Sequence, residues 1–313
     1  VQQVVTVIKP PALVCVPMFI LGASIITSGK AAEKLINMVK TFLGHIPGGL
    51  PITTSAACTL FGAVSGSTQA TVAAIGGTMR PMLLQAGYPS AFTLGLIINS
   101  SDIAFLIPPS IGFIVYGVVT STSIGKLFLA GIGPGLLIFF LFSLYSFVYS
   151  KHKKVGQLPK ASWNERIKSV KEGLPVLGFP LIIVGGIYAG IFSPTEAAAA
   201  AVAYALFLEL VVYRYLTIKS LVESFLSTGV ITGVVFVLVG AGQALSWMLS
   251  FLRIPQQFLG PLFGTDPSYI TVVFIIIVAY FVACMFVDPI VAIYVLSPIF
   301  APYVIQAGDR KST

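Results

Sequence analysis

Residues 46–86 read IPGGLPITTSAACTLFGAVSGSTQATVAAIGGTMRPMLLQA and set the architecture expected for the chain. Two apolar pieces, 46–64 and 69–86, are joined by Ser65-Gly66-Ser67-Thr68. Each piece is near or below the roughly 20 residues that one helical crossing of a bilayer requires. Polar backbone at membrane depth must be satisfied by protein or by a water-filled cavity. The stretch therefore predicts a re-entrant helical hairpin with a polar tip rather than two full crossings.

The composition of the whole chain indicates a membrane protein. Of 313 residues, 57% are apolar and 9% are charged, and the mean hydropathy is +0.98. Because a soluble domain carries roughly 25% charged residues, this chain could not cover a water-facing surface. These values exclude a soluble enzyme, a disordered tail and a secreted disulfide-rich domain. The chain is long enough for about eight to ten membrane segments. The number of full crossings is smaller if some of these segments pair as hairpins.

The next apolar segment, 90–123, also contains a break. Leu106-Ile107-Pro108-Pro109-Ser110 interrupts it, and the two prolines remove two backbone donors. The carbonyl groups of residues 104–107 are therefore expected to lose their helical partners, with an ordinary kink or tight loop as the alternative. Such carbonyls, with the hydroxyls and helix N-terminus of the hairpin tip, could hold a desolvated sodium ion or an anionic substrate.

The second half of the chain repeats this pattern weakly. Residues 81–87 (PMLLQAG) match residues 302–308 (PYVIQAG) at proline, glutamine, alanine and glycine. Fourteen residues before each proline lies a predicted hairpin tip, Ser67 or Asp288. Paired broken helices in corresponding halves point to the binding site of a secondary transporter. The other expected segments are spans at 11–27, 127–150, 174–192, 197–215, 230–252 and 269–287, amphipathic pieces at 30–43 (at the membrane surface) and 217–227, and a loop at 253–266.

The charged residues are unevenly distributed. Seven of the eighteen Lys and Arg residues lie between Lys151 and Lys171, which is typical of a cytoplasmic loop, so we expect loop 151–173 in the cytoplasm and no nucleic-acid partner. Acidic groups at membrane depth are costly and are functional candidates. The candidates are Asp102, for which a buried hydrogen-bonded role is the alternative, Glu196, for which a helix-start role is the alternative, Glu209, expected at the membrane interface, and Asp288, at a hairpin tip.

An ordered set of short motifs carries a resemblance to a known family. The motifs are Pro17-Met-Phe-Ile-Leu-Gly22, Gly48-Gly49, Ser65-Gly66-Ser67, Gly87-Tyr88, Ile107-Pro-Pro-Ser-Ile111, Tyr116-Gly117, Leu127-Phe-Leu-Ala-Gly131, Pro134-Gly135 and Gly190-Ile-Phe-Ser-Pro-Thr-Glu-Ala197. Over residues 11–308 the chain closely resembles the large, DctM-type membrane subunit of TRAP (tripartite ATP-independent periplasmic) transporters. The resemblance implies an all-α polytopic membrane protein with an elevator-type, ion-transporter-like fold. Two inverted repeats would each contribute a re-entrant helical hairpin and a broken helix.

The resemblance also implies a function. We expect the large permease subunit of a sodium-coupled importer in a bacterial inner membrane. The substrate would be an organic anion such as a carboxylate, delivered by a periplasmic binding protein, and a small four-helix membrane subunit would brace the permease. The expected divisions are 1–45 (scaffold span and interfacial helix, truncated start), 46–123 (first hairpin and broken helix of the transport domain), 124–173 (scaffold span and basic loop), 174–265 (second-repeat scaffold and broken span) and 266–313 (second hairpin, truncated end).

The site residues follow from the resemblance. The expected sodium and substrate site comprises the hairpin tip Ser65, Gly66 and Ser67, the carbonyls of Ala104, Ile107 and Pro109, and Ser110. A second site or further substrate contacts are expected at Asp102, Gly190, Thr195, Val287 and Asp288. Sodium would be bound by hydroxyl and backbone oxygens, with no other metal, cofactor or catalytic residue. The family usually has glycine in place of Ala104 and small residues in place of Ser101-Asp102, so the added carboxylate could alter ion or substrate preference.

Three other interpretations stay open. One is an elevator-type sodium/dicarboxylate-like symporter that uses no binding protein, and another is a passive solute or ion channel. An intramembrane enzyme is disfavoured, because no histidine lies in a span and no serine has an obvious base. The family chain continues beyond Gly308 into a second broken helix, so the sequence is expected to be a fragment. The identity of the substrate is not determined by the residues.

Overall fold

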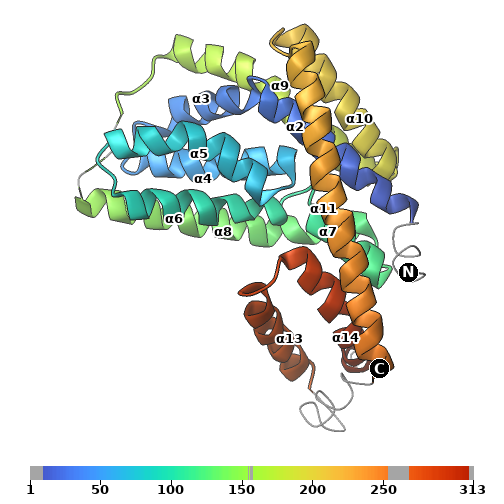
Figure 1. Ribbon diagram of the computed structural model, residues 1–313. Coiled ribbons are helices and arrows are strands. Elements are labelled where there is room, and N and C mark those ends of the chain that lie inside the picture. The colour runs from blue at the N-terminus through green and yellow to red at the C-terminus, as the bar shows by residue number, and fades with distance from the viewer. Residues whose placement is uncertain (1–9, 154, 156–157, 253–267, 310–313) are drawn as a thin grey trace. The chain divides into compact units, whose positions relative to one another are not determined.

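The computed structural model describes residues 10–153, 155, 158–252 and 268–309, and every regular element in this part of the chain is a helix (Figure 1). Four helical segments are long and apolar enough to cross a membrane, or five if the bent pair 12–28 and 31–43 forms one span. The four are α8 (Ile124–Lys153), α9 (Trp163–Tyr188), α10 (Pro194–Phe207) with its π-helical continuation η3 (Leu208–Val212), and α11 (Ile218–Phe251). These helices define a multi-pass membrane protein.

The chain divides into two compact units. The larger unit comprises residues 14–113 and 124–230, and the smaller one comprises residues 1–13, 114–123 and 231–313. Two helices, α7 (Ile111–Thr120) and α11, contribute residues to both units. The hairpin predicted from residues 46–86 lies in the larger unit, and the one predicted around Asp288 lies in the smaller unit.

A buried helix, α4 (Gly49–Ser65), forms the centre of the larger unit. All of its residues except Leu60 are buried. It contacts α3 (Ala31–Leu43), α5 (Thr68–Gln85), α6 (Ser90–Ser101) and α8, and Figure 1 shows these helices side by side. The predicted hairpin is confirmed at the level of its helices, because α4 and α5 are separated only by Gly66 and Ser67.

The amphipathic helix predicted at 30–43 is confirmed as α3. It follows α2 (Cys15–Ser28) after a bend of 68° at Gly29. The apolar face of α3 includes Leu35, Ile36 and Val39, which are buried. Because α3 makes its main contacts with α9 and α4, this face packs on protein rather than on a membrane surface.

Two segment boundaries differ from the sequence predictions. Residues 217–227 and 230–252, predicted as separate pieces, form the continuous helix α11. The Thr228 hydroxyl donates to the Ser224 carbonyl at 2.7 Å, which is a hydrogen bond within the helix. The polar residues before Gly229 therefore do not end α11. The loop predicted at 253–266 lies outside the described residues.

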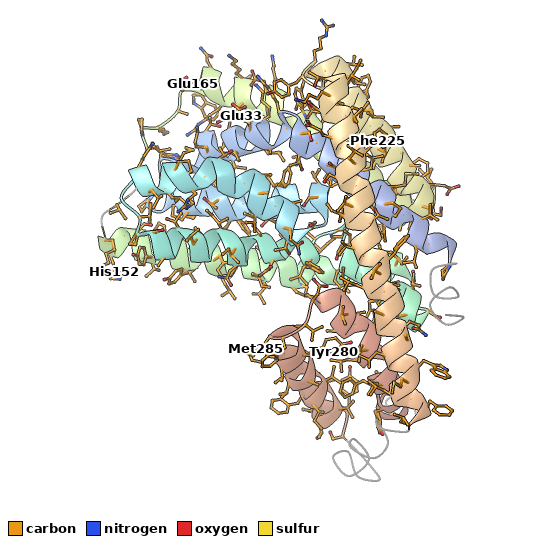
Figure 2. The ribbon with its side chains drawn as sticks, in the orientation of Figure 1. Glu33, His152, Glu165, Phe225, Tyr280 and Met285 are labelled. Atoms are coloured by element: carbon orange, nitrogen blue, oxygen red, sulfur yellow. The ribbon has the colours of Figure 1, made fainter. Side chains whose placement is uncertain are left out.

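The other difference concerns the start of α9. It begins at Trp163 rather than at residue 174, so the second half of the predicted 151–173 loop is helical. The reason is a capping box. The Ser162 hydroxyl accepts from the Glu165 N–H at 3.3 Å, and the Glu165 carboxylate accepts from the Ser162 N–H at 2.7 Å. Figure 2 shows Glu165 at this end of the helix.

The smaller unit contains a second pair of helices, α13 (Tyr269–Cys284) and α14 (Pro289–Asp309). They pack around Val272 and Phe300, and the Tyr280 hydroxyl lies 2.7 Å from the Ser297 hydroxyl (Figure 2). Tyr294 of α14 is fully buried and lies against Gly242 of α11. The break predicted at Asp288-Pro289 is therefore present between two packed helices.

Candidate functional site

The tip of the α4–α5 hairpin gathers three oxygen atoms. The Ser65 hydroxyl lies 2.9 Å from the Thr71 hydroxyl and donates to the Ser67 carbonyl at 3.2 Å. The Thr71 hydroxyl also donates to the Ser67 carbonyl, at 2.9 Å. Ser65 and Thr71 are buried and Ser67 is half-buried. The result is a compact oxygen cluster, defined here as Ser65 Oγ, Ser67 O and Thr71 Oγ1.

The Ser67 side chain has a different role from that of Ser65. Its hydroxyl accepts a hydrogen bond from the Ala70 N–H at 3.4 Å and therefore caps the start of α5. It also donates to the Gln69 side-chain oxygen at 3.1 Å. The Ser67 residue thus contributes its backbone carbonyl to the oxygen cluster while its side chain holds the helix start.

The hairpin tip lies directly against the broken helix. Gly66 has a φ of +60°, and a Cβ atom there would collide with the carbonyl oxygen of Pro109. One turn earlier, a Cβ atom on Gly62 would come within 2.8 Å of the Ala104 Cα and Cβ atoms. The structure therefore brings together the predicted tip residues and the predicted carbonyl-bearing residues Ala104 and Pro109.

The predicted break after α6 is also present. The α6 helix passes into a short 3-10 turn, η2 (Asp102–Phe105), and helix resumes at Ile111 in α7. The Ile107 N–H donates to the Ile103 carbonyl at 3.0 Å, and the Ile107 side chain packs against Gly135 of α8. The fully buried Ser110 donates to the Phe105 carbonyl at 2.6 Å. Its hydroxyl also accepts from the Phe113 N–H at 3.4 Å, so the Ser110 side chain holds the start of α7.

Asp102 lies on the η2 turn and is exposed within the chain. Its carboxyl group lies near the side chain of Thr68, the first residue of α5. A carboxylate beside the N-terminus of a helix is electrostatically favourable. The structure therefore places a carboxyl group next to the hairpin tip, exposed within the chain rather than enclosed by it.

The remaining predicted residues lie elsewhere in the chain. Gly190, with a φ of +69°, lies in the turn between α9 and α10, and Thr195 is the second residue of α10. At the start of α10, Ser193 and Glu196 form a capping box, which is the helix-start role considered for Glu196. Val287 and Asp288 lie in the smaller unit, where the Asp288 carboxylate accepts from the Ile290 N–H at 2.9 Å at the start of α14.

Glu209, predicted at the membrane interface, has a side chain that is fully buried within the larger unit. One carboxylate oxygen accepts from the Lys30 N–H at 3.3 Å, at the start of α3. A Cβ atom on Gly29 would collide with this carboxylate. Glu209 thus accepts from an N–H group at the start of α3 that has no partner within the helix.

Thr71 is the site residue that the sequence analysis missed. It lies four residues after Ser67, one helical turn into α5, so its hydroxyl faces back toward the tip. In the sequence, a hydroxyl residue one helical turn after the polar tip was the signal that could have identified Thr71.

A helical hairpin with a polar tip, seated against a broken helix in a multi-pass membrane protein, is the arrangement of a membrane transporter. The family described as "Tripartite ATP-independent periplasmic transporter, DctM component" matches residues 1–310, and the chain belongs to it. The chain is thus the large permease type of TRAP transporter subunit.

Curated relatives agree with this assignment. The chain is 57% identical to the ectoine/5-hydroxyectoine TRAP transporter large permease protein of Ruegeria pomeroyi over 308 residues, which cover 98% of the chain and 72% of that protein. Identity and coverage are the same for the ectoine TRAP transporter large permease protein of Halomonas elongata. The C4-dicarboxylate TRAP transporter large permease protein of Pseudomonas aeruginosa is 36% identical over 296 residues, covering 95% of the chain and 69% of that protein. These relatives are transporter permeases, not enzymes.

Proposed function

We propose that this chain is the permease part of a sodium-coupled importer of a small organic acid in a bacterial inner membrane. The observation that carries the proposal is the seating of Gly66 against the Pro109 carbonyl, with the oxygen cluster beside it. A periplasmic binding protein would deliver the substrate and a small four-helix membrane subunit would brace the permease, as membership of the family implies.

The chemistry of the tip supports sodium as the coupling ion. Hard cations prefer oxygen ligands, and carbonyl and hydroxyl oxygens can replace the water shell of an alkali ion. The oxygen cluster supplies three such atoms, and the Pro109 carbonyl lies against Gly66 at the centre of the tip. We assign the sodium site to these oxygens, with the Ala104 and Ile107 carbonyls as further ligands from the broken helix.

For the substrate, we favour ectoine or a related zwitterionic carboxylate over a simple dicarboxylate. Both relatives at 57% identity are named for ectoine, whereas those named for C4-dicarboxylates are 31–36% identical. The position of Asp102 supports the same choice. A carboxylate beside the tip would attract the cationic group of a zwitterion and repel the second carboxylate of a dianion.

Transport would proceed by an elevator movement of the hairpin-bearing part of the chain. The α4–α5 hairpin and the broken helix would belong to the moving domain, and α13–α14 would be the corresponding hairpin of an inverted repeat. The support is the matching PMLLQAG and PYVIQAG segments, which lie near the ends of α5 and α14. The divisions at 1–45, 46–123, 124–173, 174–265 and 266–313 would then separate scaffold from transport elements, with 151–173 on the cytoplasmic side.

Uptake into proteoliposomes tests the proposal. The permease is reconstituted with its small subunit, and radiolabelled ectoine and succinate are supplied with the binding protein under an inward sodium gradient. We expect saturable ectoine uptake that requires both sodium and the binding protein. Uptake without the binding protein would favour an independent symporter. Non-saturable flux that ignores the sodium gradient would favour a channel, and faster uptake of succinate would overturn the substrate choice.

A further inference from the structure

The α9 helix passes without a break from a charged segment into an apolar one. Its last charged residue is Glu172, and residues 173–188 carry no Asp, Glu, Lys or Arg. At about 1.5 Å per residue these residues extend about 24 Å, most of the roughly 30 Å of a hydrocarbon core. We therefore expect the first part of α9, residues 163–172, at the boundary between membrane and water.

One side of this boundary segment exposes large apolar side chains. Trp163 is 71% exposed, Ile167 is 52% exposed and Leu174 is 55% exposed. At 3.6 residues per turn these three positions fall within about 40° of arc on the helix surface. Tryptophan with aliphatic neighbours is typical of the headgroup level of a bilayer, where the ring is half in apolar surroundings.

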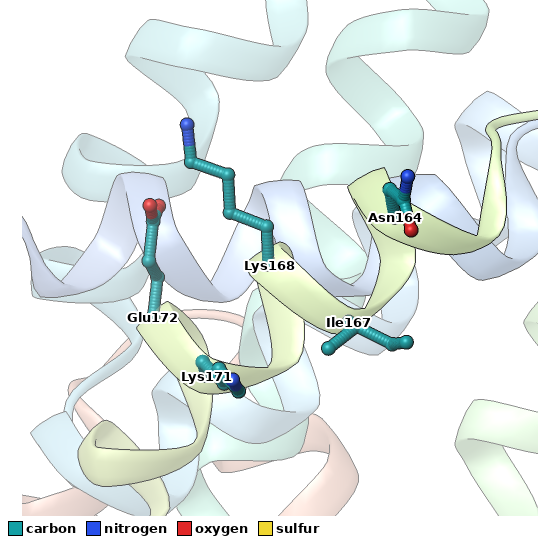
Figure 3. Close-up of a pocket in the computed structure, with 5 residues that line it drawn as sticks. All are labelled: Asn164, Ile167, Lys168, Lys171 and Glu172. Carbon is teal, nitrogen blue, oxygen red and sulfur yellow. The ribbon is translucent and has the colours of Figure 1, made fainter.

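Basic side chains lie next to this apolar stripe and line a hollow. The hollow has a volume of about 420 Å³ and is lined by Asn164, Ile167, Lys168, Lys171 and Glu172. In Figure 3 the Lys168 and Glu172 side chains extend to the same side of α9, and the Ile167 side chain lies on the other. The hollow thus combines two ammonium groups, one amide, one exposed apolar side chain and the carboxylate of Glu172.

The acidic residues of the segment are committed to other partners. Glu172 forms a salt bridge with Lys34 at 2.6 Å, and Glu165 is held in the capping box with Ser162. Within the described ranges, neither Lys168 nor Lys171 forms a salt bridge. The segment therefore presents positive charge that its own carboxylates do not neutralise by direct pairing.

Arg166 adds a third cation to the same segment. Its side chain is buried at 9% exposure between the rings of Phe42 and Trp163, at 5.4 and 5.2 Å. Among the residues that the structure describes, its Nε and Nη2 atoms have no hydrogen-bond partner. The guanidinium also holds the Trp163 ring by a cation–π contact, which fixes the start of the apolar stripe.

We propose that residues 163–174 form an interfacial site for an anionic phospholipid. The acyl chains lie along Trp163, Ile167 and Leu174, and the headgroup phosphate lies between Lys168 and Lys171. Basic hollows beside spanning helices on the cytoplasmic side attract anionic headgroups by this combination of charge and apolar surface. The proposal is independent of the transported substrate and of the coupling ion.

Tryptophan fluorescence tests this site directly, because the chain has two tryptophans. Replacing Trp247 by Phe leaves Trp163 as the reporter. The permease is placed in phosphatidylcholine vesicles that contain either brominated phosphatidylglycerol or brominated phosphatidylcholine as the quencher. Since each lysine near an anionic surface contributes about 1 kcal/mol, or roughly fivefold, we expect the relative association constant to favour the anionic lipid by at least about fivefold.

Matched variants separate this site from general attraction to the membrane. Lys168→Gln with Lys171→Gln should bring the ratio of association constants close to one, whereas Lys168→Arg with Lys171→Arg should retain it. The control, Lys126→Gln with Lys219→Gln, removes the same charge from exposed positions on other helices and should leave the ratio unchanged. All four lysines are exposed, so the variants should fold.

Three outcomes would overturn the proposal. Equal quenching by the two brominated lipids in the protein with native lysines would show that the site has no preference for anionic lipid. Weak quenching by both lipids would show that protein, not lipid, covers this face. Protection of Trp163 by inorganic phosphate added to the vesicles would assign the basic hollow to a soluble anion.

Discussion

The carbonyl oxygen of Pro109 occupies the space that a Cβ atom on Gly66 would need. This contact joins the hairpin tip to the broken helix, and it depends on the smallest residue at a position with a φ of +60°. The two polar breaks in the sequence are thus parts of one structure. Any side chain at residue 66 must push the tip away from the broken helix.

Replacing Gly66 by alanine tests this contact. The left-handed backbone alone costs an L-residue about 1 kcal/mol, and the collision with Pro109 adds to it. We expect a lower melting temperature of the purified permease and a loss of most sodium-driven uptake. The control is Gly77→Ala in the middle of α5, where a Cβ atom meets nothing within 4 Å. It should be neutral or stabilising, and equal effects of the two substitutions would contradict the tip geometry.

The Thr71 hydroxyl provides a second test, which rests on the proposed sodium site. Thr71→Val keeps the shape of the side chain but removes one oxygen of the cluster. Because a lost hydrogen bond or ligand of this kind is worth about 1 kcal/mol or more, the sodium concentration for half-maximal uptake should rise by at least about fivefold. Thr71→Ser should restore most of the affinity. Sodium titration of uptake measures both.

Thr78→Val is the matched control for Thr71, since Thr78 lies two turns further along α5 and outside the oxygen cluster. It should leave the sodium dependence unchanged. If Thr71→Val slows uptake at every sodium concentration by the same factor, the hydroxyl has a structural role and the sodium assignment fails.

Some parts of this arrangement were predictable from the sequence and others were not. The breaks at Gly66 and at Pro108-Pro109 were predictable, because glycine and proline change the backbone locally. The partner of Glu209 was not, because it lies in a distant segment of the chain. The continuity of α11 through Gly229 was not predictable either, because polar residues before a glycine can end a helix or, as the Thr228 hydroxyl does here, bond within it. Thr71 was missed for a similar reason. Its spacing fits the tip, but only the direction of its hydroxyl in the folded hairpin shows its role.

Glu209 should be important for stability at the α2–α3 bend. Glu209→Ala leaves the Lys30 N–H without this acceptor, which costs about 1 kcal/mol. Glu209→Gln keeps an acceptor oxygen and should cost less. The control, Glu223→Ala, removes an exposed carboxylate on α11 and should leave the melting temperature unchanged. Thermal unfolding of the purified permease measures all three. A melting temperature unaffected by Glu209→Ala would show that water replaces the carboxylate.

Asp102 connects the structure of the tip to the choice of substrate. Its carboxyl group lies beside Thr68 at the start of α5 and is exposed, so it can face a bound solute. Asp102→Asn removes the charge but keeps the size. We expect the KM for ectoine to rise by roughly tenfold, because one charge-assisted contact is worth about 1.5 kcal/mol. Succinate uptake should increase, since the repulsion of its second carboxylate is relieved.

A comparison of the two substrates distinguishes a structural role of Asp102 from a direct contact with the substrate. A residue that only stabilises the α5 N-terminus would, when neutralised, weaken the uptake of both substrates by a similar factor and lower the melting temperature. A residue that contacts the substrate changes the ratio of the two kcat/KM values and leaves the melting temperature nearly unchanged. Glu223→Gln removes the same charge from an exposed position and should alter neither quantity. A parallel loss for ectoine and succinate would therefore assign Asp102 to the helix start and leave the choice of substrate to other residues.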